Sequence, residues 1–302
     1  MERYYSYSRF LKEYFGEKVY KICLDAGFTC PNRDGRLSRR GCLFCSEGGS
    51  GEYAEQAGLP IREQIARGRS QTASKYQGQH YLAYFQAFTN TYAPLPVLRS
   101  LYEEALSCQE ICGLIIGTRP DCLDEDVLQL LEELHQIKPV FLELGLQTCH
   151  DQTAHFLNRG YDSAVFADAV RRCDRHHLRV TAHVIAGLPG ESREMQYETI
   201  DFLNALPVSG IKISMLYLLK RTPLADYYEK HPFPLYDMEE YVDVVTGCIE
   251  RLRPDIVIER ITGDGPRDLL IAPDWILHKR LVLNTIQKEL KRKNITQGKS
   301  YV

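Results

Sequence analysis

The sequence predicts an α/β protein built as a partial (β/α)6 TIM-like barrel with a helical C-terminal extension. Short apolar runs alternate with longer segments of helical periodicity, and the links between them are mostly short. This alternation is typical of βαβ crossovers, which place their strands in a parallel sheet. The number of units, about six, suits a partial or full barrel. An open doubly wound sheet is the alternative.

The strands are predicted from apolar runs of strand length. The central runs are almost continuously apolar, as expected for strands that are buried on both faces of a parallel sheet. The predicted strands are residues 19–24, 80–85, 113–117, 140–146, 179–186, 211–218 and 256–261.

The helices are predicted from apolar residues that recur every three or four positions, as Leu128, Leu131 and Leu134 do. Asp121 or Asp124 is a candidate cap for that helix. We expect an N-terminal extension over residues 1–18, the barrel over 19–270 and a helical tail over 271–302. The predicted helices are residues 95–110, 123–136, 162–176, 191–206 and 238–252, with a last one from about 273.

Composition excludes several classes of protein. The chain has 302 residues, with 44% hydrophobic and 25% charged residues, which is ordinary for a globular protein. No apolar run approaches the roughly 18 residues that span a membrane, and the first 20 residues lack the apolar core of a signal peptide. We therefore expect a cytoplasmic protein without a membrane partner. In a reducing compartment, the ten cysteines favour a metal site over a disulfide framework.

Cys30, Cys42 and Cys45 lie in a glycine- and arginine-rich loop over residues 28–58. A redox dithiol would open a helix directly after a strand and would need no third cysteine. A structural zinc site would need a fourth ligand, and this loop has no histidine. Three thiolates favour an iron–sulfur cluster with one open iron, and zinc with a remote ligand is the alternative.

Polar residues follow several predicted strands at their carboxyl ends, where parallel α/β folds bind ligands. We interpret them as the rim of one site, although each could instead cap the helix that follows it. Gly187 and Gly190 lack side chains, which would let the backbone approach a flat ligand closely or form a tight turn before the next helix. The polar segments are residues 86–92, 118–121, 143–147, 183–190 and 220–223.

Six stretches together resemble the radical S-adenosylmethionine (radical-SAM) superfamily, in its Elongator catalytic-subunit-like branch and specifically the YtqA/YhcC family. The resemblance runs from residue 25 to about residue 275. It implies a radical-SAM barrel with a [4Fe-4S] cluster on the three cysteines and S-adenosyl-L-methionine (SAM) on the fourth iron. The superfamily commonly has CxxxCxxC, whereas eleven residues separate Cys30 from Cys42, a widening that Elongator-like members share. The stretches are residues 25–35, 84–94, 118–121, 143–148, 187–189 and 260–266.

The same resemblance assigns cofactor contacts by motif position. Phe44 resembles the aromatic residue that packs near the adenine, and Gln147 and Arg159 resemble contacts to the ribose and carboxylate of SAM. Residues 86–90 replace the usual Gly-Gly-Glu stretch, and His183 replaces an aspartate of some relatives. The expected SAM-binding residues are Phe44, Gln86, Thr89, Asn90, Thr118, Arg119, Glu143, Gln147, Arg159, His183 and Gly187.

The family resemblance also implies a substrate, the wobble uridine of tRNA, whose carboxymethylaminomethyl group at C5 becomes aminomethyl. A flavodoxin or ferredoxin would supply electrons, and the basic tail over residues 279–299 fits a tRNA phosphate contact. Asp264, Arg267 and Tyr217 are the candidates for substrate contact or catalysis; a sealing loop and a core tyrosine are the alternatives. A protein or metabolite substrate, or a metal-binding adaptor without catalysis, remains open.

Overall fold

A parallel seven-stranded sheet forms the framework of the protein. The structure is a computed structural model that describes residues 2–49, 51, 54–55, 57–74, 76, 78–263 and 265–301. The strand order of the sheet is β1-β2-β3-β4-β5-β6-β8. Chain order and spatial order therefore coincide. The strands are β1 Tyr20–Leu24, β2 Tyr81–Phe85, β3 Ile111–Thr118, β4 Val140–Gln147, β5 Arg179–Ala186, β6 Gly210–Met215 and β8 Val257–Arg260.

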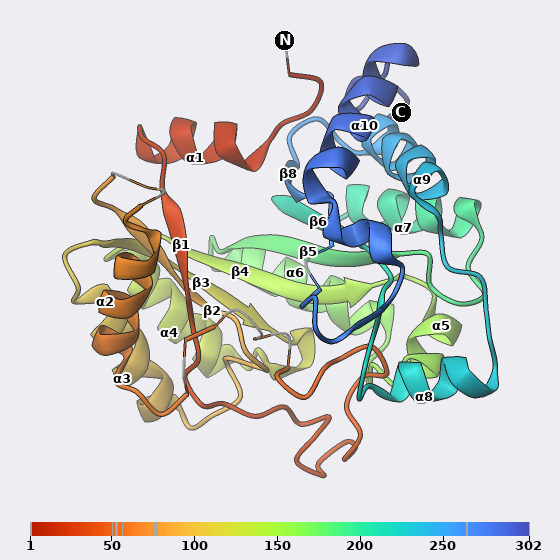
Figure 1. Cartoon of the computed structure of the whole chain (residues 1–302). Helices are drawn as coiled ribbons and strands as arrows, with labels where there is room; N and C mark the ends of the chain where they lie inside the picture. The colour runs from red at the N-terminus through yellow and green to blue at the C-terminus, as the bar shows by residue number, and fades with distance from the viewer. Residues whose placement is uncertain are drawn as a thin grey trace.

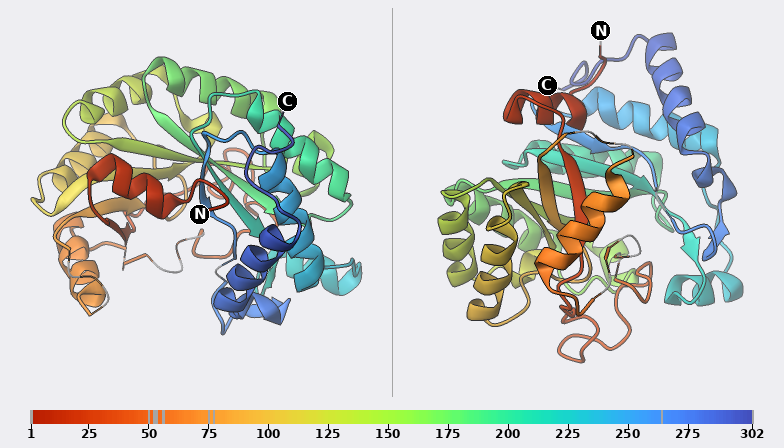
Figure 2. Two further views of the ribbon diagram at one scale, coloured as in Figure 1. Left: turned by 90° about the horizontal axis from the view of Figure 1, so that it is seen from above. Right: turned by 60° about the vertical axis from the view of Figure 1, so that its left-hand side comes forward.

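The sheet curls into a half-barrel with helices along its outer side (Figure 2). A doubly wound sheet would reverse its strand order at a switch point, and this sheet does not. The predicted partial barrel is thus confirmed. The helices are α1 Tyr7–Phe15, α2 Ile61–Thr72, α3 Leu95–Leu106, α4 Glu125–His135, α5 Asp151–Phe156, α6 Ser163–Arg175, α7 Arg193–Asn204, α8 Pro223–Lys230, α9 Met238–Arg251 and α10 Lys279–Arg292.

The strands present different chemistry on their two faces. Outward residues such as Ile116, Leu142 and Leu144 are buried in the large core that they share with the helices. On the inner face, apolar residues occur near the start of the strands, where Leu82 and Phe141 pack with α1 in a second core. Farther along the strands the inner face becomes polar.

Helix α1 closes the end of the half-barrel opposite the cysteine loop (Figure 1). Ser6 caps the helix by accepting a hydrogen bond from the backbone of Arg9. The Phe10 ring meets the Phe141 ring edge-on, with centroids 6.0 Å apart. The inside of the barrel is therefore covered by apolar side chains at this end.

Short segments pair with both outer strands of the open sheet. The backbone NH of Ile258 in β8 donates to the carbonyl of Tyr5 at 2.8 Å, and Ser6 forms a parallel bridge with the same residue. On the other side, the NH of Glu55 donates to the carbonyl of Cys23 in β1 at 3.1 Å.

The predicted strands and helices are all present, with bounds that shift by a few residues. The prediction missed α1, α2, α5, α8 and the short antiparallel pair of β7, Leu218–Leu219, with β9, Leu270–Ala272. Strand β6 ends at Met215, so the predicted run to residue 218 was too long. None of the described helices combines the length and apolar character that a bilayer crossing requires.

Candidate functional site

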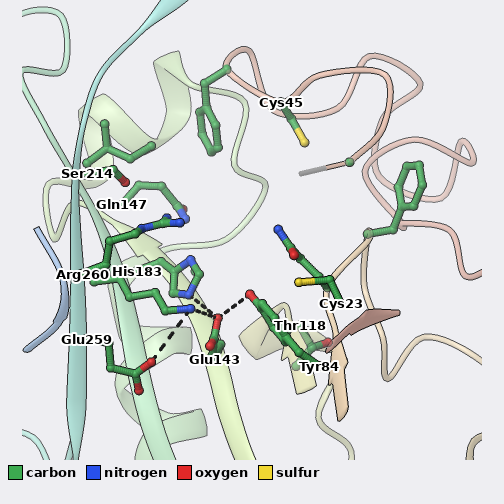
Figure 3. Close-up of a pocket in the computed structure, with 18 of the residues that line it drawn as sticks. Cys23, Cys45, Tyr84, Thr118, Glu143, Gln147, His183, Ser214, Glu259 and Arg260 are labelled. Atoms are coloured by element: carbon green, nitrogen blue, oxygen red, sulfur yellow. Dashed lines mark hydrogen bonds and ion pairs between the residues drawn. The ribbon is translucent and has the colours of Figure 1, made fainter. Parts of the chain in front are cut away.

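A cavity of about 760 Å³ lies inside the half-barrel, between the inner faces of the strands and the cysteine loop (Figure 3). Segments from most of the chain length meet there, because every strand of the main sheet contributes to the lining. This volume is within the range of small-molecule sites. The cavity is therefore the candidate active site.

Cys30, Cys42 and Cys45 all line this cavity and all are free thiols. Asn32 holds the middle of their loop, since its side-chain amide donates to the carbonyl of Asn158 at 2.6 Å and lies 3.4 Å from Sγ of Cys42. The structure thus brings together the three cysteines that are distributed along the predicted loop.

Arg33 joins the two halves of the cysteine loop. Its guanidinium donates to the carbonyls of Cys45 at 3.0 Å and Glu47 at 3.2 Å, and to that of Ser46. A Cβ on Gly41 would lie 2.9 Å from Nε of Arg33, so the absence of a side chain at Gly41 leaves room for the arginine side chain. The guanidinium therefore positions the last two cysteines.

The donor set fits an iron–sulfur cluster. Burial raises the pKa of Cys42 to about 12, and Cys45 raises it further while Arg119 opposes the shift. Cluster binding would displace that proton, since the thiolate is the ligand. Within the described residues, no three His, Cys, Asp or Glu side chains converge on a single-ion site. In a [4Fe-4S] cluster each thiolate binds a different iron, so the cysteines need not converge on one point.

Most of the expected SAM contacts also line the cavity. Arg119 is held there by two hydrogen bonds to Asp121, at 2.9 and 2.8 Å. Gln147 has a positive φ of 59° beside a register shift in β4, a strained conformation that redirects the strand end. The lining includes Phe44, Gln86, Thr89, Thr118, Arg119, Glu143, Gln147 and His183.

Asn90, Arg159 and Gly187 do not belong to the lining. The amide of Asn90 donates to the carbonyl of Gly117 at 2.8 Å. Arg159 is fully buried, and its guanidinium donates to the backbone carbonyls of Tyr161 at 2.9 Å and Thr148 at 2.7 Å. Asn90 and Arg159 thus bind backbone carbonyls outside the lining, and the predicted contact of all three residues with SAM stays a prediction.

The candidates for substrate contact are placed differently. Tyr217 lines the cavity, next to Gly263 and Gly265, where a Cβ would lie 3.3 and 3.1 Å from its ring. Arg267 is exposed and outside the lining. Asp264 lies outside the described residues.

An interior charged cluster that the sequence analysis did not assemble extends across the cavity toward α1. It is centred on Glu143, which is 2% exposed and accepts a hydrogen bond from Tyr84 at 2.6 Å. Nε2 of His183 lies 2.8 Å from the same carboxylate (Figure 3). The cluster comprises Lys21, Tyr84, Glu143, His183, Lys212 and Glu259, one from each of β1, β2, β4, β5, β6 and β8.

Two lysines balance two carboxylates in this cluster. Lys21 lies 3.2 Å from Glu143 and 3.3 Å from Glu259. Lys212 pairs with Glu143 and lies 4.0 Å from Glu259, whose other oxygen accepts from Thr181 at 2.6 Å. Such pairing offsets the cost of removing the charges from water.

The cluster shifts the protonation of its members. Burial alone would raise the pKa of Glu143, but Lys212 and Lys21 hold it well below its usual range. Burial lowers the pKa of Lys212 to about 8, against the pull of Glu143 and with the repulsion of Lys21. Burial and Lys212 lower the pKa of His183. The carboxylate therefore stays charged, and His183 favours its neutral form.

Comparison with protein families decides the class of protein. The model of the Radical SAM superfamily matches residues 34–203, and that of the Radical_SAM C-terminal domain matches residues 208–292. The chain belongs to the radical-SAM superfamily. It is a radical-SAM enzyme, with a [4Fe-4S] cluster and SAM as its cofactors.

The relatives support the placement within this superfamily. The chain is 42% identical over 300 residues to the uncharacterized protein YtqA of Bacillus subtilis, covering 99% of this chain and 93% of YtqA. It is 39% identical over 262 residues to the protein YhcC of Escherichia coli K12, covering 86% and 84%. The resemblance to the YtqA/YhcC family is confirmed.

More distant matches lead toward the Elongator branch. A tRNA uridine(34) acetyltransferase of Methanocaldococcus jannaschii is 24% identical over 167 residues, which is 53% of this chain and 29% of that protein. The structure of Methanocaldococcus infernus Elp3 with an N-terminal deletion superposes with a TM-score of 0.71 at 15% identity, covering 92% of this chain and 64% of that one. This structure confirms the fold of the radical-SAM enzyme described above.

Proposed function

We propose that this enzyme acts on tRNA and converts the carboxymethylaminomethyl group at C5 of the wobble uridine into aminomethyl. The observation that carries the proposal is the cavity, which is lined both by the interior charged cluster and by the three cysteines. A charged wall suits a substrate group that is itself ionised. The distant relative named as a tRNA uridine(34) acetyltransferase supports the choice of nucleoside.

Cys30, Cys42 and Cys45 would hold the cluster, and Phe44, Gln147 and the polar strand ends would hold SAM. When bound, these cofactors would supply radical chemistry through reductive cleavage of SAM. Hydrogen abstraction from the carboxymethyl carbon, return of one electron from the substrate and addition of water would then release that group as glyoxylate and leave the aminomethyl amine. A flavodoxin or ferredoxin would donate the electron.

The chain's own residues prepare the cavity for that chemistry. Leu82 and Phe141 pack with α1 and keep water from entering through the start of the strands. The paired charges of the interior cluster fix polar groups in place, so they need little reorganisation when a charged ligand binds. Tyr217 lies on the same cavity wall as Ser214 and Leu216, within reach of a ligand.

Anaerobic reconstitution tests this function. We expect the reconstituted protein with reductant and SAM to form 5′-deoxyadenosine, and to form aminomethyl-uridine in tRNA that carries carboxymethylaminomethyl-uridine. Cys42→Ala should lose both products together with its bound iron. Cys149→Ala, which changes a thiol outside the cavity lining, is the matched control and should keep them.

Other outcomes separate the alternatives. Deoxyadenosine without any change in tRNA nucleosides would favour a protein or metabolite substrate. Stoichiometric zinc and no deoxyadenosine would favour an adaptor without catalysis. Unchanged wobble uridines in a deletion strain would also contradict the proposed tRNA reaction.

A further inference from the structure

Arg260, at the end of β8, is turned into the cavity by an irregularity of its strand. The β6–β8 ladder pairs Ile211 with Ile258 but the next residue, Lys212, with Arg260. Glu259 is therefore an extra residue, as in a β-bulge, and bulges redirect side chains. As a result both Glu259 and Arg260 line the cavity, although neighbouring strand residues normally point to opposite faces.

Arg260 forms no ion pair among the described residues. Its Nε is buried without a hydrogen-bond partner, and no described carboxylate lies within 4.0 Å of its guanidinium. Glu143 and Glu259 are already shared by Lys21 and Lys212. Three cations thus face two carboxylates, which leaves one positive charge unbalanced on this wall.

The position of Arg260 shows where its ligand would bind. Its side chain extends toward the middle of the cavity, near His183 and Gln147 (Figure 3). An arginine fork binds a carboxylate through two parallel hydrogen bonds, and burial strengthens such a pair. The group that completes this site is therefore an anion that arrives with a ligand.

We infer that Arg260 is a specificity-determining residue that binds the carboxylate of the substrate's carboxymethyl group. This inference rests on the proposed function, which supplies a substrate with one carboxylate on a short side chain. The site selects the carboxymethylaminomethyl nucleoside over the aminomethyl product, because only the former pairs with the guanidinium. Loss of the carboxylate also leaves the product without this contact, which favours its release.

Binding of two free nucleosides to the reconstituted protein under anaerobic conditions tests the inference. Wild type should bind carboxymethylaminomethyl-uridine roughly 10–100-fold more tightly than aminomethyl-uridine, the span expected for a charge-assisted pair. Arg260→Gln should lose this preference while its affinity for aminomethyl-uridine stays within about twofold. Arg260→Lys should recover part of the preference, and Arg175→Gln, an exposed arginine of α6, should keep all of it.

SAM carries a carboxylate too, so SAM affinity is measured on the same variants. An unchanged SAM affinity in Arg260→Gln shows that the variant is folded and supports the inference. A loss of SAM affinity with the nucleoside preference intact overturns it, and so does a wild type that binds both nucleosides equally.

The two proposals fail in different ways. An Arg260-dependent preference in a protein that leaves tRNA unchanged would contradict the proposed reaction and support the carboxylate site. Equal conversion of limiting tRNA by wild type and Arg260→Gln would support the reaction and overturn the role of Arg260.

Discussion

At the scale of single residues, the enzyme keeps ionised side chains inside a barrel that usually holds apolar layers. Glu143 is the centre of this arrangement, since Lys21 and Lys212 both pair with it. Removing one partner of such a group leaves an uncompensated charge, which is more costly than the pair itself. The interior cluster is therefore a place where a single substitution has large effects.

Lys212 should give the stability of the protein a measurable pH dependence. Its pKa falls from 10.5 to about 8 on folding, so between those values the unfolded chain holds the extra proton. Stability contributed by this group therefore rises with pH across that window, by about 3 kcal/mol in total. Urea unfolding from pH 7 to 10.5 should show this rise in wild type relative to Lys212→Met.

Lys230→Met, at an exposed position of α8, is the control and should run parallel to wild type at every pH. A constant difference between wild type and Lys212→Met would show that Lys212 keeps its ordinary proton affinity in the folded protein.

Gly187 and Gly190 form a matched pair for a second prediction. Both have a positive φ, 82° and 81°, which costs an alanine about 1 kcal/mol. Only at Gly187 would a Cβ also meet a neighbour, the ring of Tyr236 at 2.9 Å. We expect Gly187→Ala to lower the free energy of unfolding by roughly 1–3 kcal/mol more than Gly190→Ala. Equal losses in denaturant titrations would rule out the contact with Tyr236.

At the scale of elements, the sequence predicted the helices and strands that are rich in buried apolar residues. The apolar runs of β3, β4 and β5 specify buried strands, and α4 shows its leucines at helical spacing. Helices α1 and α2 were missed because each buries only two large apolar residues, which are Ile61 and Ile65 in α2. In α1 these are Phe10 and Leu11, within a short segment of mixed aromatic and polar residues.

The site was predictable in part, where its residues are close together in the sequence or follow a predicted strand. Close spacing identified the cysteines, and polar strand ends identified much of the cavity lining. The interior cluster was harder, because Lys21, Lys212 and Glu259 come from strands far apart in the sequence. In the sequence, each of these residues is a charged residue within a predicted strand, which indicates an unusual interior position. Only the curl of the sheet shows that the three charges meet.

Helix α1 should contribute to stability mainly through its most deeply buried ring, that of Phe10. Phe10 is 8% exposed and packs on Phe141, so Phe10→Ala should cost about 3 kcal/mol of unfolding free energy. Tyr14→Ala, in the same helix but 42% exposed, should cost clearly less. Hydrogen exchange should quicken at the first residues of the strands in Phe10→Ala, and equal protection in both variants would contradict the packing role of α1.

At the scale of the whole molecule, basic residues lie at two distant places. Arg39 and Arg40 are exposed on the cysteine loop, at one end of the barrel, whereas Lys288 and Lys291 are exposed on α10 toward the other end (Figure 1). Neither pair lines the cavity, but Arg40 directly precedes Gly41, which does, whereas no residue of α10 lines it. We therefore expect the loop to contact tRNA phosphates near the target base more directly than the basic tail does.

Paired charge removals test this expectation. Arg39→Gln with Arg40→Gln should weaken tRNA binding and flatten its salt dependence by about 0.7–0.9 per lost phosphate contact in a plot of log affinity against log salt. Lys288→Gln with Lys291→Gln changes the net charge equally and should have the smaller effect. A larger effect of the α10 pair would move the tRNA interface to the tail.

The paired outer strands have a consequence for how the protein behaves in a crowded solution. A half-barrel that never closes leaves two sheet edges, and bare edges recruit strands of other molecules into aggregates. In this chain the backbone of Tyr5 occupies part of one edge and that of Glu55 part of the other. The half-barrel can thus stay open along one side while part of each edge is already paired within the chain and less able to template self-association.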